Sequence, residues 1–402
     1  MPPNRPVESK EELQNHFGSS QKLEILNKEQ MEDLLQTDVP TDVWEEAYKK
    51  NLLSFSKEFV KRTVYFASDN SDLEHIYLIS FLTNLTELHL NENIISDISA
   101  ISKLKNLKKL ELQGNSIKDI SALQSLTDLT HFNLQRNKLT SYTLALPNLV
   151  DLSLGNNKLI DKSGLQHSPK LESLNLSETE TTDLRSIPHQ LFGLKQLDLS
   201  ENNLTKISYL SNFVDLQYLA LSCLNQLTSI EPLEFCTKLT ELRIQETNVS
   251  DIWPVQFMKN LKKLIMTDTK VVDLHPLQHL HKLEIIYAYS ARIIDVFPLS
   301  NLTQLKTLLI NNNRITNGET LKHHKNFSKY KLQDQKVPTV NEQMFYNRIF
   351  FVHSSQKIQN ENKISKLRAL FASKKNYVSA ILNNQIMMIS KELNLLFILN
   401  YI

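Results

Sequence analysis

The sequence predicts an α/β solenoid built from stacked copies of one short unit. Three observations support this fold class: leucines return at a fixed interval, they alternate with polar residues, and asparagine or aspartate follows at fixed positions. The leading leucine recurs every 22 or 23 residues, apart from one step of 20, at Leu85, Leu107, Leu129, Leu149, Leu171, Leu194, Leu216, Leu239, Leu261, Leu283 and Leu305. Such a period indicates a repeat architecture rather than one compact core.

Each copy predicts one short strand. The copies follow the pattern LxxLxLxxNxIxDIxxLxxL, and leucines that alternate with polar residues have the two-residue period of a half-buried strand. A partial copy precedes the series around Phe66, and a degenerate copy follows it at Phe327. Because one copy cannot bury its own leucines, we expect the strands to stack into a parallel sheet along one side of the solenoid.

Polar residues recur at two further positions. The eighth residue after the leading leucine is asparagine or threonine at Asn93, Asn115, Asn137, Asn157, Thr179, Asn202, Thr247, Thr269 and Asn313. A buried side chain there can bond the backbone of neighbouring turns, so we expect a ladder that is interrupted at Ala291. Four residues further on, Asp97, Asp119, Asp161, Asp183, Asp251, Asp273 and Asp295 are suited to cap a short outer helix. In four copies Pro232, Pro254, Pro276 and Pro298 fit its first turn. With only 6 glycines, we expect the turns to rely on Asn and Asp side chains rather than on positive φ.

This pattern resembles the leucine-rich repeat family, in the short 22-residue subclass that includes the intracellular regulatory subunit of protein phosphatase 1 and the bacterial internalins. The resemblance covers residues 63–338 and implies a horseshoe with a parallel sheet on its concave face and a role in protein binding. It also makes a phosphatase catalytic subunit an alternative partner. The acids expected on the concave face are scattered, however, and no tryptophan accompanies them, which departs from the acidic, aromatic surface of that regulator.

Charge divides the chain. From Leu321 to the end there are 13 Lys/Arg against 4 Asp/Glu, although the net charge of the whole chain is only +1. We expect a helical N-terminal cap over residues 1–62, the leucine-rich repeat domain over 63–338 and a basic helical tail over 339–402. Residues 363–378 have the pattern of a basic amphipathic helix. We expect it to cap the solenoid, and peripheral association with a membrane or nucleic acid through the tail is the alternative function.

A partner-binding surface is predicted in the last copies. Residues two, four and six places after each leading leucine should face the concave surface, and these are small or polar in the first six copies. From the seventh copy onward they become apolar, aromatic and basic: Tyr218, Arg243, Lys263, Ile265, Ile285, Tyr287, Tyr289, Leu309 and Lys331. Since neighbouring strands lie roughly 4.8 Å apart, Ile265, Tyr287 and Leu309 should form one stripe. Its composition is typical of an interface hot spot, and the alternative is that the tail or last repeats fold over it.

The sequence favours a non-enzymatic protein without a cofactor. The glycines stand singly, in no phosphate-binding pattern, and two cysteines are too few for a disulfide framework or a thiol zinc site. His275, His279 and His281 should lie on an outer turn and point to solvent, so no metal site is expected. The first 20 residues lack the apolar core of a signal peptide. We therefore expect a monomeric protein of the cytoplasm, or of the nucleus, that binds another protein.

Overall fold

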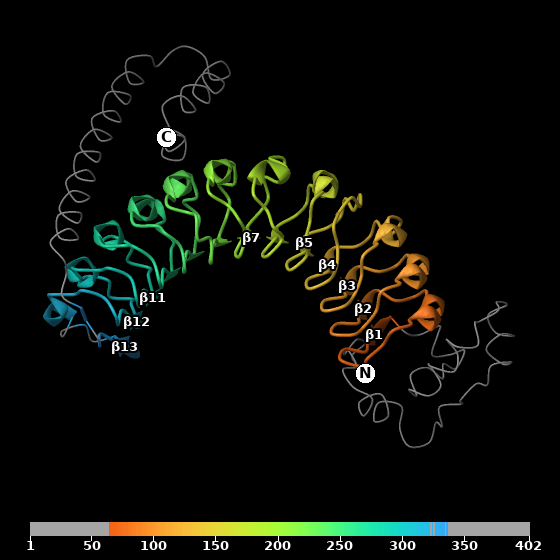
Figure 1. The fold of residues 1–402 in the computed structure, drawn as a ribbon, viewed down its shortest axis with the longest axis horizontal. Helices are drawn as coiled ribbons and strands as arrows, with labels where there is room; N and C mark the ends of the chain where they lie inside the picture. The colour runs from red at the N-terminus through yellow and green to blue at the C-terminus, as the bar shows by residue number, and fades with distance from the viewer. Residues whose placement is uncertain (1–63, 322–323, 325, 334, 337–402) are drawn as a thin grey trace, which may run out of the picture. The chain divides into compact units, whose positions relative to one another are not determined.

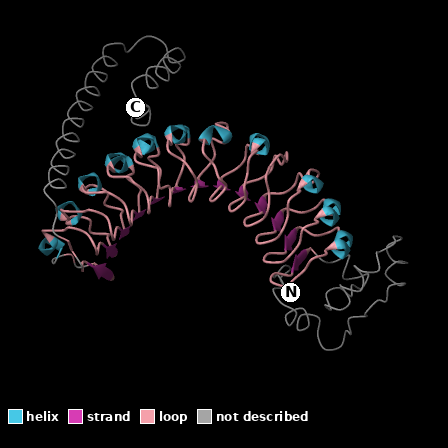
Figure 2. Cartoon of the chain, in the orientation of Figure 1, coloured by secondary structure: helices cyan, strands magenta, loops and turns pink. Residues whose placement is uncertain are grey.

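The computed structural model describes residues 64–321, 324, 326–333, 335 and 336, which fall into two compact units divided after Leu204. Each unit is a stack of the predicted repeats, with strands along one side and short 3-10 helices along the other (Figures 1 and 2). The expected N-terminal cap and the expected basic tail lie outside the described residues. Among the residues that are described, no helix combines the length and the apolar character that a membrane span requires.

In the first unit, the strands described between residues 64 and 204 pair in parallel and in chain order. They are β1 (Tyr65–Ala67), β2 (Glu87–His89), β3 (Lys109–Glu111), β4 (His131–Asn133), β5 (Asp151–Ser153), β6 (Ser173–Asn175) and β7 (Gln196–Asp198). The outer helices are η1 (Tyr77–Phe81), η2 (Ser99–Lys103), η3 (Ser121–Leu123), η4 (Ser163–His167) and η5 (Leu184–Ser186). The partial copy around Phe66 thus supplies a strand, as predicted.

The second unit repeats this arrangement, again with parallel strands in chain order. Its strands are β8 (Tyr218–Ala220), β9 (Glu241–Arg243), β10 (Lys263–Ile265), β11 (Ile285–Tyr287), β12 (Thr307–Leu309) and β13 (Lys329–Lys331). Its outer helices are η6 (Ser208–Asn212), η7 (Glu231–Phe235), η8 (Trp253–Phe257), η9 (His275–Leu277), η10 (Phe297–Leu299) and η11 (Gly318–Leu321). The degenerate copy at Phe327 therefore also forms a strand.

The leading leucines form the core. All eleven of them, from Leu85 to Leu305, are 0% exposed, and so are most of the leucines at the centres of the strands. Full burial of one leucine stabilises a fold by about 1.5–3 kcal/mol. Each copy packs only on its neighbours, so this stabilisation depends on stacking rather than on any single copy.

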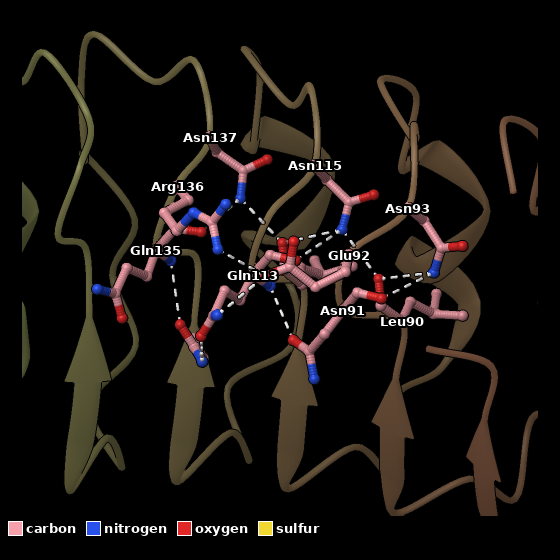
Figure 3. A network of polar contacts seen from close by, with 11 residues as sticks. Leu90, Asn91, Glu92, Asn93, Gln113, Asn115, Gln135, Arg136 and Asn137 are labelled. Carbon is pink, nitrogen blue, oxygen red and sulfur yellow. Dashed lines mark hydrogen bonds and ion pairs between the residues drawn. The ribbon is translucent and has the colours of Figure 1, made fainter. Parts of the chain in front are cut away.

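The asparagine ladder is confirmed. In the side chain of Asn115, Nδ2 donates to the carbonyl of Leu90 in the preceding copy at 2.9 Å (Figure 3). Its Oδ1 accepts from the amide of Ile95 at 3.0 Å. Nδ2 also lies 3.1 Å from the carbonyl of Leu112 in its own copy. Asparagine makes equivalent bonds between copies at Asn93, Asn137, Asn157, Asn202 and Asn313. The ladder satisfies backbone groups that the turns would otherwise bury without partners.

Other residues modify the ladder. Thr247 keeps one bond, from its hydroxyl to the carbonyl of Ile244 at 2.8 Å. Ala291 interrupts the series as predicted, and the fully buried Leu224 interrupts it as well, which the sequence pattern did not indicate. In the last copy Gln335 takes the role: Nε2 donates to the carbonyl of Ile310 at 3.1 Å, and Oε1 accepts from the amide of Ile315 at 3.0 Å.

The expectation that the turns avoid positive φ is wrong. The residue seven places after the leading leucine has φ between 52° and 68° in every copy: Glu92, Gly114, Arg136, Asn156, Glu178, Glu201, Cys223, Glu246, Asp268, Ser290 and Asn312. A left-handed conformation costs about 1–2 kcal/mol for a residue with a β-carbon. The chain adopts it because the sharp turn after each strand brings the next residue, the ladder position, into the interior.

The predicted aspartates bond the starts of the outer helices, but only Asp183 is itself the N-cap residue, and the others stand one residue before it. Asp97 Oδ1 accepts a hydrogen bond from the amide of Ser99, the first residue of η2, at 2.8 Å. The same contact to a helix start is made by Asp119, Asp161, Asp183, Asp251, Asp273 and Asp295. The four prolines stand in the first turns of η7, η8, η9 and η10, where no amide donor is needed.

The shortened copy between Leu129 and Leu149 differs on its outer side, where the described residues contain no helix. Tyr142 is 0% exposed there, and Ser141 instead pairs with Asp161 of the next copy in a parallel bridge. A β-carbon on Gly164 would lie 2.8 Å from the backbone of Leu144 and of Tyr142. Glycine thus permits the close backbone approach that replaces the missing helix.

Candidate partner-binding surface

The sheet register arranges the predicted binding residues of the second unit into two rows. The central row is made of residues paired in successive strands: Arg243, Ile265, Tyr287, Leu309 and Lys331. The flanking row is Tyr218, Glu241, Lys263, Ile285, Thr307 and Lys329. We call the face of β8–β13 that bears both rows the strand face. Ile265, Tyr287 and Leu309 are adjacent in the central row, so the predicted apolar stripe is present.

Exposure varies along the strand face. The stripe residues are half-buried, as is Ile285 beside them, whereas Tyr289, two residues beyond Tyr287, is 39% exposed. Ala220, which the repeat pattern places on the surface, is only 1% exposed, so this expectation is wrong. The part of the strand face that offers apolar area to a partner therefore lies on β10–β12.

One carboxylate neutralises much of the charge at the β9 end. Oε1 of Glu241 lies 2.6 Å from Nε of Arg243 and 3.1 Å from Nζ of Lys263. The guanidinium carbon of Arg243 also lies 5.4 Å from the centroid of the Tyr218 ring, within the range of a cation–π contact. Tyr218, Arg243 and Lys263 thus form one cluster around Glu241, which holds the predicted cations in fixed positions.

The β13 end has a different character. Lys329 and Lys331 are exposed, and no carboxylate of the described residues lies within 4.0 Å of either ammonium group. Tyr330, the residue between the two lysines in β13, is 38% exposed and stacks on Phe327 with ring centroids 4.9 Å apart. Partial burial raises the pKa of the Tyr330 hydroxyl. Two positive charges therefore stand at this end of the central and flanking rows.

In the first unit, polar side chains bond to one another on the corresponding face. Asn133 Nδ2 donates to Glu111 Oε2 at 2.9 Å, and Lys109 Nζ lies 3.4 Å from the other carboxylate oxygen. At the ends of the strands, Glu92 Oε1 accepts from Gln113 at 3.1 Å and from Arg136 at 2.9 Å (Figure 3). This face therefore presents polar groups, as the sequence predicted, and lacks an apolar stripe among its described residues.

The three histidines occupy the outer side. His279 and His281 are exposed as expected, but His275 is half-buried, and its Nδ1 lies 2.6 Å from Asp273 Oδ1. The side chain turns inward because Asp273, which accepts from the amide of His275 at the start of η9, is itself only 3% exposed. Within the described part of the chain, no three His, Cys, Asp or Glu side chains are grouped as a metal site would require.

Comparison with known proteins supports the repeat assignment. The family model described as "Leucine Rich repeats (2 copies)" matches residues 83–125 and 105–146. The structure of an internalin, inlF, from Listeria monocytogenes is 29% identical in sequence with a TM-score of 0.66, and the match covers 75% of this chain and 91% of that one. No curated protein matches the sequence.

Two more distant structures share the fold. A leucine-rich repeat protein from Leptospira interrogans is 21% identical with a TM-score of 0.58, over 73% of this chain and 84% of that one. The functional domain of InlJ from Listeria monocytogenes is 22% identical with a TM-score of 0.55, over 70% of this chain and 66% of that one. With the ladder, the strands and the outer helices in place, the chain has the fold of leucine-rich repeat proteins, matches that repeat family over residues 83–146 and is similar to the internalins.

Proposed function

We propose that this protein is a non-enzymatic scaffold that binds one protein partner through the strand face of its second unit. Leucine-rich repeat domains generally bind other proteins, which gives the class of function. The observation that supports the location is the row formed by Ile265, Tyr287 and Leu309, with basic side chains at both of its ends. A contiguous apolar stripe rimmed by charge has the composition of an interface core.

The mechanism is the presentation of a preformed surface. The ladder bonds and the buried leucines hold the strands in register before a partner arrives, so little conformational entropy is lost on binding. Tyr287, Tyr289, Ile265 and Leu309 would supply apolar contact area, and Arg243 and Lys263 would orient the partner. The expected monomeric state and the expected cytoplasmic or nuclear location are part of this proposal and rest on the sequence.

The test compares capture of a partner by the intact chain and by variants of the strand face. Tyr287→Ala and Leu309→Asp should each weaken capture by roughly 30-fold or more, since truncating a hot-spot residue costs about 2 kcal/mol or more. Phe297→Asp is the matched control, because Phe297 is 61% exposed on the outer helix η10. It should leave capture unchanged.

Two outcomes would contradict the proposal. Equal capture by all variants would remove the strand face from the interaction. Loss of the far-UV circular dichroism signal in Tyr287→Ala would show that the stripe packs internally.

A variant lacking residues 339–402 tests the alternative function, because membrane or nucleic-acid binding through the tail would disappear with those residues and fall steeply with added salt. Immunoblotting of the captured material tests a phosphatase catalytic subunit as the partner.

A further inference from the structure

We infer that the strand face binds a protein segment with two parts. Apolar side chains of this segment lie on the apolar stripe, and carboxylates at one end of it lie against Lys329 and Lys331. This inference rests on the proposed function, since it gives the chemistry of the partner at the same strand face. Lys331 lies directly opposite Leu309 in the register, and Lys329 lies opposite Thr307. A segment that follows the apolar stripe toward β13 therefore passes from Leu309 onto two ammonium groups.

The balance of charge on the strand face points to the same end. Within the two rows, Arg243 and Lys263 share the carboxylate of Glu241 at 2.6 and 3.1 Å. Lys329 and Lys331 have no such neighbour among the described residues, and both are exposed. An acidic group on a partner would thus gain more at β13 than at β9, because at β9 it would meet cations that are already neutralised and would lie close to Glu241.

A protein segment fits this arrangement better than a nucleic acid. Surfaces that bind single-stranded nucleic acid combine aromatic side chains with cations that follow the phosphate backbone along the whole site. Here the cations of the two rows that lack a carboxylate neighbour stand only at one end, and the single aromatic residue of the central row, Tyr287, lies between the aliphatic Ile265 and Leu309. Neighbouring strands lie roughly 4.8 Å apart, which is close to the 5–6 Å between residues i and i+4 on a helix surface. An acidic amphipathic helix could therefore match the rows.

The experiment selects a displayed library of random peptides on the intact chain. Selected sequences should be enriched in Asp and Glu next to Leu, Ile, Phe or Tyr. A second selection on the double variant Lys329→Glu/Lys331→Glu should lose the enrichment in acids. A labelled peptide chosen on the unmodified protein should bind this variant roughly tenfold or more weakly at low ionic strength, and the difference should shrink with salt.

A matched control carries the same change of charge elsewhere in the second unit. Lys270→Glu/Lys282→Glu reverses two exposed lysines that lie outside both rows, and it should leave selection and affinity unchanged. Neutral or basic selected peptides, or an unchanged enrichment in acids with Lys329→Glu/Lys331→Glu, would overturn the inference. The two lysines would then act only to discourage pairing at the edge of the sheet.

Failure of the proposed function gives a different result. In that case no family of peptides would be selected, or the selected peptides would bind Tyr287→Ala as well as the unmodified chain. Peptides that need Tyr287 but not the two lysines would leave the proposed function standing and remove the inference about acidity. Binding of a single-stranded oligothymidine that needs the lysines but not Tyr287 would overturn the inference in favour of nucleic acid.

Discussion

The carboxylate of Glu92 lies where a β-carbon on Gly114 would stand: that carbon would be 2.5 Å from Glu92 Oε2. Glu92 uses this space to reach Gln113 in the next copy and Arg136 in the copy after it (Figure 3). Gly114 is also the one glycine among the eleven positive-φ residues that stand seven places after a leading leucine. Glycine at this position therefore avoids the energetic cost of positive φ and also leaves space for the side chain of Glu92.

Gly114→Ala should destabilise the protein. An alanine at φ +68° costs about 1–2 kcal/mol, and its β-carbon would displace Glu92 from its two partners. The midpoint of urea unfolding should fall. Gly193→Ala is the control, because the nearest atom to its new β-carbon would be the carbonyl oxygen of Leu171 at 3.8 Å. It should be neutral or slightly stabilising, and equal losses in both variants would contradict the role given to Gly114.

The ladder predicts an order of stability at Asn115. Asn115→Ala leaves the buried amide of Ile95 without its partner, at a cost of about 1–3 kcal/mol, whereas the carbonyls of Leu90 and Leu112 keep the bonds from Asn93 and Asn137. Asn115→Thr should lower the free energy of unfolding less than Asn115→Ala does, because a threonine hydroxyl can still donate to the carbonyl three residues earlier, as Thr247 does. Urea unfolding followed by circular dichroism measures both. A threonine variant no more stable than the alanine variant would contradict this account.

Glu234 on η7 should make stability depend on pH. Burial, and then the charge of Glu231, raise the pKa of Glu234 from 4.5 to about 7. The folded state thus holds this proton more tightly than the unfolded state, so its contribution to stability falls as pH rises from about 4.5 to 7. Glu234→Gln should therefore raise the free energy of unfolding at pH 8 by about 1 kcal/mol after allowance for solvent screening, and the melting temperature should rise with it. Thermal melts from pH 4 to pH 8 should show the gain vanishing at the acid end, and a gain that is constant with pH would contradict it.

The two cysteines should differ in reactivity. Cys236 is 0% exposed, and burial raises its pKa to about 12, whereas Cys223 is half-buried. Because the thiolate is the reactive form, a disulfide reagent should modify only Cys223 in the native protein and both cysteines in denaturant. Each modified cysteine releases one molecule of the reagent's thiol, so the absorbance of that thiol gives the number of cysteines that have reacted. A Cys223→Ser variant that still reacts in the native state would show that Cys236 is accessible.

Much of the fold could be predicted because each copy repeats one local environment. The alternation around Leu88 or Leu110 shows which side chains enter the core, and the recurrence of Asn115 or Asp97 at a fixed distance shows which backbone groups they reach. The apolar stripe was predictable for the same reason, since strands of equal period fall into register. Its role in binding stays a prediction.

The ladder and the turns show where sequence pattern was insufficient. Gln335 replaces asparagine in the last copy, because its longer side chain still reaches the carbonyl of Ile310, and no residue identity indicated this. Positive φ was missed because seven of the eleven positions hold Glu, Arg, Cys or Ser, such as Glu201 and Cys223, which are not typical of a left-handed turn. Stacking of the copies and the ladder bonds impose that conformation against local preference.

By itself, then, the sequence determined the repeat, the strands, the helix starts and the row of apolar residues, because these follow from periodicity along the chain. Only the tertiary structure decided which charges are paired. Arg243 and Lys263 both reach Glu241, whereas Lys329 and Lys331 stand apart, although all are basic residues at equivalent positions of their copies. The physical reason is that pairing depends on the residue that each cation faces in the sheet. Glu241 faces Lys263 from the neighbouring strand, 22 residues away in the sequence, and also lies beside Arg243, whereas Lys329 and Lys331 face the uncharged Thr307 and Leu309.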